Sequence, residues 1–440
     1  MKIKVKTLDY DGVMSLPRLK HKNPKKQSKL FRIIMKALSA GEMKAVGFEY
    51  DEIGMDKLGK GQPALYLMNH SSFTDLQIVG TLLADKSYHI VCTNDGFVAK
   101  EGLMRAIGCI PTKKFISDIV LVKDMKYAID ELNSSIVMYP EASYSFDGTE
   151  TPLPDSLGKC LKLLGVPVVM IRTKGAFLRD PLYNCLQKRD VKVTARVEYL
   201  ISPEEIKSKK PEELNDILKR AFEYDHFREQ VEAGIIINEE FRADGLHRVL
   251  YKCPKCGTEG DMKGEGIYIT CRSCGDRHVL TEKGMLESAE EDREPEAVKG
   301  KRILEAAEED RAFEYVSDWY KWERELVRQE IEARTYTMEL DVDIMMLVDT
   351  KSIYKVGSGK LVHNSDGFEL TGCDGKLEFK VSSKAMYSLY ADYYWYELGD
   401  MICIGDAKRQ YYCFPVNQEK AIVAKARLAT EELYKMKTVQ

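Results

Sequence analysis

The sequence predicts an α/β protein with a twisted, mostly parallel sheet and flanking helices, followed by two smaller domains. Short apolar runs alternate with helical patterns through residues 61–245, which is typical of a parallel sheet covered by helices. Two Cys-x-x-Cys pairs lie in residues 250–280, and short strand-like runs separated by turn residues fill residues 336–415. The chain has 440 residues, more than one ordinary core holds, so several domains are expected.

Five apolar runs are the predicted strands of the α/β domain. They are residues 63–69, 88–94, 134–140, 166–173 and 191–201. The segments between them have apolar residues at helical spacing, which predicts helices. After the last strand, Ser-Pro-Glu-Glu and Lys-Pro-Glu-Glu each place Pro at the first helical position and acids in the first turn. Both motifs therefore predict helix starts.

Charge is unevenly distributed along the chain, although the formal net charge is only −4. Residues 1–44 carry twelve Lys or Arg against three acids, and residues 281–318 carry thirteen acids against six bases. A basic surface favours anionic partners such as lipid headgroups. We interpret residues 1–60 as a basic, membrane-docking segment, with a solvated basic arm as the alternative. Residues 281–335 are interpreted as a charged helical linker, interrupted at Pro295 and Gly300.

Neither a membrane span nor an export signal is predicted. The sequence has no run of about eighteen apolar residues, the length that a transmembrane helix needs. The first residues, MKIKVKTLDYDG, lack the apolar centre of a signal peptide. We therefore expect a cytoplasmic protein, peripheral on the inner face of a membrane, with its cysteines reduced. The balanced net charge indicates no nucleic-acid partner.

Four cysteines have the spacing of a metal site. Cys253, Cys256, Cys271 and Cys274 form Cys-x-x-Cys-x14-Cys-x-x-Cys, and a Gly follows each pair. Each pair can occupy two corners of a tetrahedron, and the Gly permits the tight turn between them. Four thiolates leave no open position, so the pattern predicts structural Zn²⁺ in a zinc ribbon. A redox pair of disulfides and a nucleic-acid-binding ribbon are the alternatives.

The first candidate catalytic residues are in the segment NHSSFTD, where His70 precedes Asp75 by five positions. This segment follows a predicted strand and opens a helix, the position where open α/β sheets bind ligands. A neutral imidazole can take the proton of an attacking hydroxyl, and a carboxylate on its other nitrogen fixes the tautomer. The pair is also compatible with helix capping and a hydrogen-bonded loop histidine.

Three further segments follow in order: GCIPTKK (108–114), YPEASYS (139–145) and GVPVVMI (165–171). Together with His-x4-Asp, these segments resemble the four sequence blocks of the glycerolipid acyltransferases, which include the lysophospholipid (1-acylglycerol-3-phosphate) acyltransferases. The four blocks span roughly residues 60–175. The resemblance implies that family's fold and the transfer of a fatty acyl group to a hydroxyl.

The resemblance also implies roles for individual residues. His70 is implied as the general base and Asp75 as its partner, with Glu141 as the acid of the third block. The acceptor headgroup is expected near residues 108–114. Residues implied in substrate binding are Gly108, Lys113, Lys114, Ser143 and Arg172. The alternative for the two consecutive lysines is a solvated loop.

The third block departs from the family pattern. The places of the family's Gly, Thr and Arg are taken by Ala142, Ser143 and Tyr144. In the family that Arg is associated with the acceptor's phosphate, so the departure leaves open a non-phosphate acceptor. The donor implied by the resemblance is an acyl thioester, on coenzyme A or on acyl carrier protein (ACP), which would then be a partner.

The two ends of the chain carry further predictions. The segment SKLFRIIMKALSA (28–40) mixes apolar and basic residues, which favours either an interfacial amphipathic helix or packing on its own domain. Residues 336–440 form short strands and one closing helix, an arrangement that resembles pleckstrin-homology or GRAM-type domains. The function that the resemblance implies is acyl transfer to a lysophospholipid, with 1-acylglycerol-3-phosphate as the expected acceptor. The alternatives are O- or N-acylation of another acceptor and a catalytically silent lipid-binding adaptor.

Overall fold

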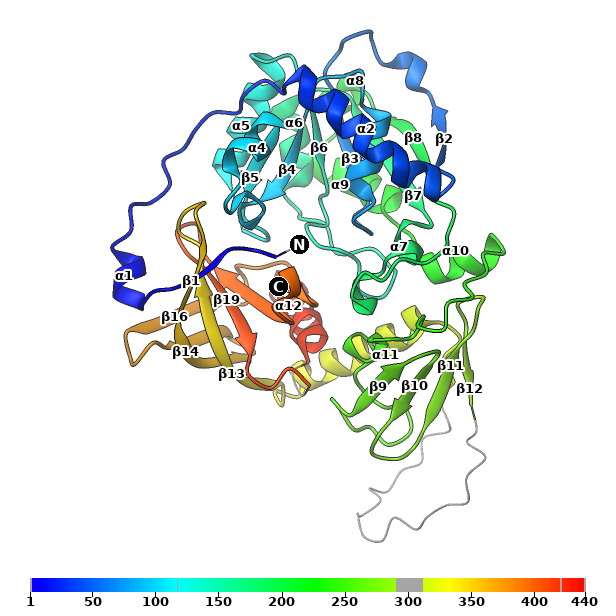
Figure 1. Cartoon of the computed structure of the whole chain (residues 1–440), viewed down its shortest axis with the longest axis vertical. Coiled ribbons are helices and arrows are strands. Elements are labelled where there is room, and N and C mark those ends of the chain that lie inside the picture. Colours follow the sequence, from blue (N-terminus) through cyan, green and yellow to red (C-terminus); the bar gives the residue numbers. More distant parts are fainter. Residues whose placement is uncertain (1, 117, 290–311, 420–421, 439–440) are drawn as a thin grey trace.

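The computed structural model describes residues 2–116, 118–289, 312–419 and 422–438. Within these residues the chain forms an α/β domain, a small sheet that carries the cysteine pairs, and a larger β-rich domain closed by a helix (Figure 1). The described helices include none with both the length and the apolar character needed to cross a membrane.

The α/β domain is built on a mixed sheet that has seven strands among the described residues, in the order β2-β8-β7-β3-β6-β4-β5. Its strands are β2 (Glu49–Ile53), β3 (Leu65–Met68), β4 (Tyr88–Thr93), β5 (Cys109–Thr112), β6 (Ser135–Met138), β7 (Val168–Lys174) and β8 (Thr194–Ile201). Five strands are parallel, whereas β8 pairs antiparallel with β7 and reverses, together with β2, the direction of one edge. Every residue of β3 and β6 is buried, as expected for strands covered on both faces.

Helices cover both faces of this sheet. They are α2 (Lys29–Ala45), α3 (Asp75–Leu82), α4 (Glu101–Ala106), α5 (Ile119–Asp130), α6 (Leu157–Leu164), α7 (Ala176–Arg179), α8 (Pro203–Ser208), α9 (Pro211–Ala221) and α10 (His226–Glu232). Residues of α3 share a core with Tyr66 and Val137 on one face, and residues of α5, α6 and α9 share a core with Leu65 and Leu67 on the other. The predicted helix starts are found at Pro203 and Pro211.

Edge strand β2 and strand β5 are absent from the predicted strands. All residues of β2 are exposed. Because neither face of the strand is buried, its sequence, EYDEI, needs no alternation of apolar and polar residues. Its strand conformation is set by pairing with β8. Such an edge strand leaves no local signal in the sequence.

The predicted N-terminal segment, residues 1–60, is divided between two domains. Strand β1 (Val5–Thr7) pairs parallel with a strand of the β-rich domain, and α1 (Tyr10–Met14) buries Tyr10 and Val13 in that domain's core. Helix α2 instead packs on α3 of the α/β domain. The first sixty residues therefore contribute to both the β-rich domain and the α/β domain.

The cysteine pairs lie in a small antiparallel sheet with the order β12-β11-β10-β9. Its strands are β9 (Met262–Glu265), β10 (Tyr268–Cys271), β11 (Arg277–Leu280) and β12 (Leu286–Ser288). Strand β12 extends this unit past residue 280, the predicted boundary. We call residues 250–288 the ribbon.

The described part of the predicted linker is packed rather than solvated. Residues 290–311, which include Pro295 and Gly300, lie outside the described residues. Helix α11 (Val316–Glu332) follows them and buries Trp319, Glu323 and Val327. The indole of Trp319 donates to the Lys252 carbonyl at 3.0 Å, and the Lys252 amide donates to Glu323 at 2.8 Å. These contacts fasten α11 to the ribbon.

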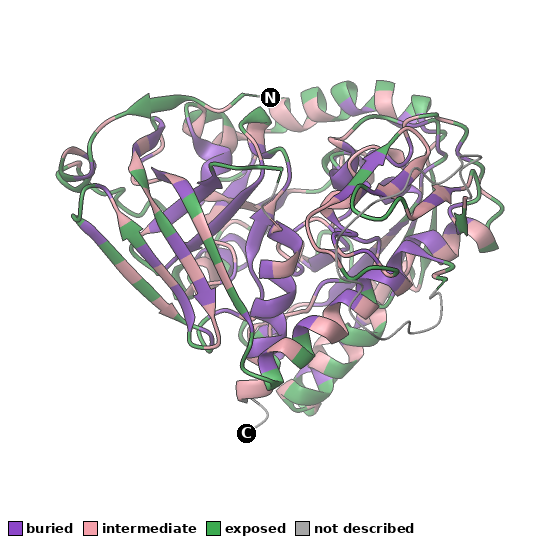
Figure 2. Cartoon of the chain, turned by 90° about the horizontal axis from the view of Figure 1, so that it is seen from below, coloured by how far each residue is buried: buried purple, intermediate pink, exposed green. Residues whose placement is uncertain are grey.

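The C-terminal domain is an antiparallel sheet with the order β16-β15-β14-β13-β19-β18-β17, with β1 added beside β14. Its elements are β13 (Thr337–Met346), β14 (Ile353–Asn364), β15 (Gly367–Gly372), β16 (Leu377–Ser382), β17 (Tyr390–Asp392), β18 (Met401–Gly405), β19 (Gln410–Pro415) and α12 (Val423–Thr438). The predicted β-rich region with a closing helix is therefore present. Buried and exposed residues alternate along its outer strands (Figure 2), as in a sheet with one solvated face.

One hydrophobic core joins the ribbon, α11, α12 and the β-rich domain to loops of the α/β domain. It includes Phe146, Cys253, Trp319, Ile344 and Leu428, each at most 2% exposed. Helix α12 lies near the centre of the molecule, between the β-rich sheet and the α/β domain (Figure 1). The three units therefore form one packed body.

Candidate active site

His70 and Asp75 form a hydrogen-bonded pair at the carboxyl end of β3. The Nδ1 atom of His70 lies 2.9 Å from Oδ2 of Asp75, the first residue of α3. The backbone amides of Ser71 and Ser72 donate to the same oxygen at 3.0 and 3.2 Å. The carboxylate is thereby held in place, and Nε2 of His70 remains as the ring atom that can accept a proton.

Glu141 contacts the main chain of His70 rather than its ring. Its Oε2 atom accepts the His70 amide at 2.9 Å. Its Oε1 atom accepts the Thr151 amide at 2.8 Å and the Tyr224 hydroxyl at 2.7 Å. The side chain of Glu141 is fully buried. Its hydrogen bond to the His70 amide positions the main chain that carries the imidazole.

Two tyrosines of the third block stack on the ring of His70. The ring centroids of Tyr139 and Tyr144 lie 4.4 and 4.1 Å from that of the imidazole. The side chain of His70 keeps 17% exposure. Tyr144, which occupies the place of the family's Arg, therefore covers the imidazole.

Burial changes the proton affinity of the site. It lowers the pKa of His70 well below its usual range, and the nearby charge of Lys114 lowers that pKa further. Burial raises the pKa of Asp75 to about 7, against the opposing effect of the Ser71 and Ser72 amides. It also raises the pKa of Glu141 to about 7. The imidazole is consequently neutral at pH 7, the form that can act as a base.

The residues predicted to bind the acceptor make contacts with other parts of the protein. Gly108 has a φ of +90°, and a Cβ there would lie 2.7 Å from the Tyr88 carbonyl, so close packing requires glycine at this position. The Lys113 ammonium contacts the Ala407 carbonyl of the C-terminal domain. Arg172 donates to Glu229 at 2.9 Å.

Lys114 is partly buried between the α/β and β-rich domains. Its ammonium lies 4.0 Å from the ring centroid of Tyr390, and it faces the negative charges of Asp95 and Asp392. The roles of Lys113, Lys114 and Arg172 in acceptor binding stay predictions. Ser143 lies in residues 139–151, which we call the third-block loop, and its hydroxyl donates to the Tyr144 carbonyl at 3.2 Å.

Further buried polar residues around the site carry no signal in the sequence. The Ser72 hydroxyl donates to Asp180, and the Ser71 hydroxyl lies 3.2 Å from Nε2 of His226. Nδ1 of His226 lies 3.3 Å from Glu229. Arg427 of α12 contacts the third-block loop. Asp180, His226 and Arg427 each lie more than a hundred positions from the block that they contact, so no local spacing identifies them.

The four predicted metal ligands converge. Their sulfur atoms lie within 4.8 Å of one another, with Cys253 and Cys274 at 3.6 Å and Cys256 and Cys271 at 3.7 Å. A tetrahedron with Zn–S bonds of about 2.3 Å has edges of about 3.8 Å, so the cluster fits Zn²⁺. Gly257 and Gly275, after the two pairs, both have positive φ, which forms the two tight turns.

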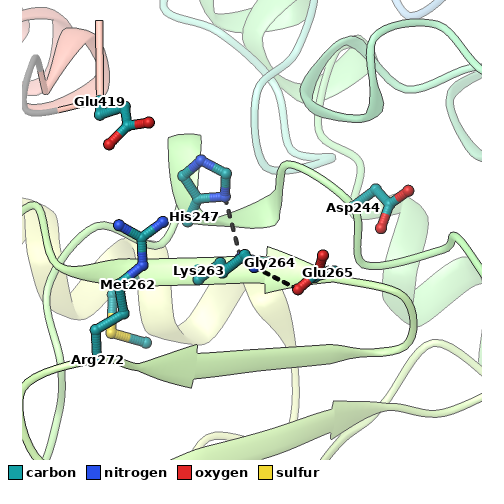
Figure 3. A pocket seen from close by; sticks show the side chains of 8 residues that line it. All are labelled: Asp244, His247, Met262, Lys263, Gly264, Glu265, Arg272 and Glu419. Carbon is teal, nitrogen blue, oxygen red and sulfur yellow. Dashed lines mark hydrogen bonds and ion pairs between the residues drawn. The ribbon is translucent and has the colours of Figure 1, made fainter. Parts of the chain in front are cut away.

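Two surface cavities lie away from the imidazole. One, of about 370 Å³, lies beside the ribbon and is lined by residues that include His247, Arg272 and Glu419 (Figure 3). The other, of about 410 Å³, is lined by residues that include Arg172 and Glu229. Within the described part of the chain, neither of these two cavities is lined by His70.

Comparison with known proteins relates this site to an enzyme family. Residues 51–174 match the family model of the acyltransferases. The acyltransferase region thus contains His70, Asp75 and Glu141, whereas the ribbon and the β-rich domain lie outside it. Among solved structures, the chain is similar to the crystal structure of the 1-acyl-sn-glycerophosphate (LPA) acyltransferase PlsC from Thermotoga maritima, at 16% identity and a TM-score of 0.33. This match covers 44% of the present chain and 77% of the other. The search of curated proteins found no match.

Proposed function

We propose that this protein transfers a fatty acyl group from an acyl thioester, acyl-CoA or acyl-ACP, to the hydroxyl of a lysophospholipid such as 1-acylglycerol-3-phosphate. The observation that carries the proposal is the His70–Asp75 pair, hydrogen bonded at 2.9 Å inside the acyltransferase region. A positioned base is what a weakly nucleophilic hydroxyl requires.

The proposed reaction needs no covalent enzyme intermediate. Nε2 of His70 takes the hydroxyl proton as the acceptor oxygen attacks the thioester carbonyl. The C–S bond then breaks, and the leaving thiolate receives the proton from the imidazolium, which yields an ester and a free thiol. Asp75 stabilises the imidazolium between these steps.

The test uses His70→Ala in the full-length protein, with labelled acyl thioesters and a panel of lysolipids. Because general-base catalysis contributes about 10²–10⁴-fold, the variant should lose acyl transfer by at least that factor. His21→Ala is the matched control, since the side chain of His21 is 49% exposed. Zinc content should be equal in all three proteins. Wild-type activity in His70→Ala would exclude the mechanism.

The same panel decides the class of acceptor. A non-phosphate acceptor is the second candidate, because the contacts of Lys113, Lys114 and Arg172 are made with other residues of the protein. In that case a lysolipid without a phosphate monoester, an amine or a glycolipid would be acylated faster than lysophosphatidate. A preference for lysophosphatidate would instead support the primary proposal.

A silent lipid-binding adaptor is the third candidate, favoured by the stacking of Tyr139 and Tyr144 on His70. It predicts lipid binding with equally low acyl transfer in the wild type and His70→Ala. Turnover by the wild type would exclude it.

We further propose that the protein acts as a peripheral protein on the cytoplasmic, inner face of a membrane. Leu30, Ile33 and Leu38 of α2 are 63%, 67% and 72% exposed, and Lys29 and Lys36 lie on the same helix. Apolar side chains beside cations favour an anionic lipid surface. Ile33→Asp should reduce sedimentation with anionic vesicles, whereas Leu163→Asp, at an exposed position on α6, should not. Equal sedimentation of both variants would exclude docking through α2.

We propose that the Cys253, Cys256, Cys271 and Cys274 cluster binds one structural Zn²⁺. The sulfur spacing supports this assignment. Metal analysis of the purified protein should give one zinc per chain, and serine at Cys271 should abolish it. Retention of zinc by that variant would exclude the assignment.

A further inference from the structure

A buried arginine of the C-terminal helix reaches the third-block loop of the acyltransferase region. Arg427 of α12 is 4% exposed. Its Nη2 donates to Thr151 Oγ1 at 2.8 Å, and its Nη1 lies 3.5 Å from Ser143 Oγ and 3.4 Å from the Tyr144 carbonyl. The guanidinium carbon lies 4.2 Å from the ring centroid of Phe146. Arg427 thus contacts the third-block loop at two places, around Ser143 and at Thr151.

A short chain of hydrogen bonds connects Arg427 to the candidate base, His70. Thr151, which accepts from Arg427, donates its own amide to Oε1 of Glu141 at 2.8 Å. The other oxygen of Glu141 accepts the His70 amide at 2.9 Å. The two links through Thr151 are buried hydrogen bonds and the link to the His70 amide is a part-buried one. Networks of this kind fix the relative positions of their members.

The local sequence explains why the loop needs an external support. Ala142 adopts a left-handed conformation with a φ of +55°. A non-glycine residue pays about 1–2 kcal/mol for that conformation, which persists only where surrounding contacts impose it. The family has Gly at this place. The loop of this chain therefore relies on contacts with other parts of the structure.

The remaining contacts of Arg427 show that it is itself held in place. Its Nε donates to Glu431 Oε1 at 3.2 Å, one turn along α12. Arg324 of α11 forms an ion pair with Glu431, with Nη1 2.7 Å from Oε2, and the Ser388 hydroxyl donates to Oε1 of Glu431 at 2.7 Å. A buried guanidinium requires such partners, because an unpaired buried charge is costly. Since all three nitrogens of Arg427 are engaged within the protein, the geometry favours support of the loop over contact with substrate.

We propose that Arg427 is a positioning residue, through which α12 holds residues 139–151 in the conformation that places Glu141 on the His70 amide. The inference rests on the proposed acyl transfer. It makes the C-terminal domain part of the active site, because the domain supplies the contact that the third block lacks locally. It also assigns a function to the docking of α12 between the two larger domains (Figure 1).

The experiment compares Arg427→Met and Arg427→Lys with Arg328→Met in the full-length, zinc-loaded protein. Arg328 lies on α11, is 46% exposed and pairs only with exposed acids among the described residues, so the same substitution there is the matched control. Small displacements of catalytic groups cost about 100-fold in rate. We therefore expect kcat to fall about 100-fold in Arg427→Met and less in Arg427→Lys, with the KM for the acyl thioester changed less than about twofold.

Hydrogen exchange gives a readout that does not depend on activity. The amides of Thr151 and Ser145 are hydrogen bonded in the wild type, so exchange in residues 139–151 should accelerate in Arg427→Met and remain unchanged in Arg328→Met. If Arg427→Met does not fold, Arg427→Lys and Thr151→Val, which removes the Oγ1 acceptor, provide the same comparison.

The outcomes separate the two proposals. Unchanged exchange, or unchanged kcat in a variant whose loop exchanges faster, would overturn the role of Arg427. A wild type that transfers no acyl group would overturn the proposed function, and exchange alone would then decide whether Arg427 holds the loop. A rise in KM without a fall in kcat would assign Arg427 to binding and overturn positioning.

Discussion

The ribbon and the His70 site are both polar clusters, but they are assembled from different distances along the chain. All four sulfur atoms of the ribbon cluster come from residues 253–274, and Cys256 and Cys274 are exposed. The His70 site combines residues of the loop after β3, α3, the third-block loop and α12. Its Asp75, Glu141 and Arg427 side chains are buried, whereas His70 is 17% exposed. The proposed Zn²⁺ would therefore join residues that are close in the sequence. The His70 site, in contrast, forms only when the domains pack together.

This difference implies different sensitivities to substitution. With Zn²⁺ bound as proposed, the metal would hold the two cysteine turns of the ribbon together. The His70 site relies on hydrogen bonds among groups that burial has removed from water, where the loss of one partner leaves another unsatisfied. The two clusters share one core through Cys253, Trp319 and Phe146. Unfolding of the ribbon should therefore also affect the His70 site, but less than it affects the ribbon itself.

The largest expected effect is that of removing the metal. Structural zinc contributes about 10–16 kcal/mol to the folding of isolated zinc domains at pH 7, so Cys271→Ser should unfold the ribbon. Hydrogen exchange should accelerate across residues 250–288 and much less across residues 61–175. Cys160→Ser, at a thiol outside the cluster, is the control. Equal acceleration in both regions would contradict the local character of the ribbon.

The next effect concerns the carboxylate of the candidate site. Asp75→Asn keeps the shape of the side chain but removes the negative charge that accepts the Nδ1–H of His70 and two backbone amides. We expect acyl transfer to fall by about 10²–10⁴-fold, with zinc content unchanged. Asp130→Asn, at an exposed ion pair on α5, should remain within about twofold. Activity of Asp75→Asn near that of the control would contradict the pairing.

The smallest effect is a change in the dependence of stability on pH. Burial raises the pKa of Asp147, in the third-block loop, from the ordinary value of 3.8 to about 6. Between these values the folded state binds a proton that the unfolded state does not, so this residue makes stability fall as pH rises from about 4 to about 6.

Asp147→Asn should remove that dependence. Relative to the wild type, the variant should gain about 1–3 kcal/mol of unfolding free energy between pH 4 and pH 7. Urea titrations at the two pH values measure the difference, and Asp130→Asn serves again as the exposed control. An equal pH dependence of Asp147→Asn and the wild type would show that the carboxylate of Asp147 is solvated.

Several features of the fold were accessible from local patterns. Strands β3, β4, β6, β7 and β8 were predicted from apolar runs. Of these, β3 and β6 are buried throughout, because strands covered on both faces need apolar residues at every position. Helices α8 and α9 begin at the prolines that marked them. Strand β2 was not predicted, and helix α11 lies within the predicted helical linker of residues 281–335, but its buried side chains were not predicted. Pairing with β8 determines the exposed strand, and charged residues conceal the buried stripe of α11.

The sequence by itself determined the cysteine cluster and the His70–Asp75 pair, since both depend on residues a few positions apart, where spacing along the chain limits separation in space. Only the tertiary structure decided that Tyr139 and Tyr144 stack on His70, that Lys114 packs on Tyr390, and that Arg427 contacts the third-block loop. These contacts join segments up to 284 residues apart. They form when whole domains bury a common core, and no spacing in the sequence records them.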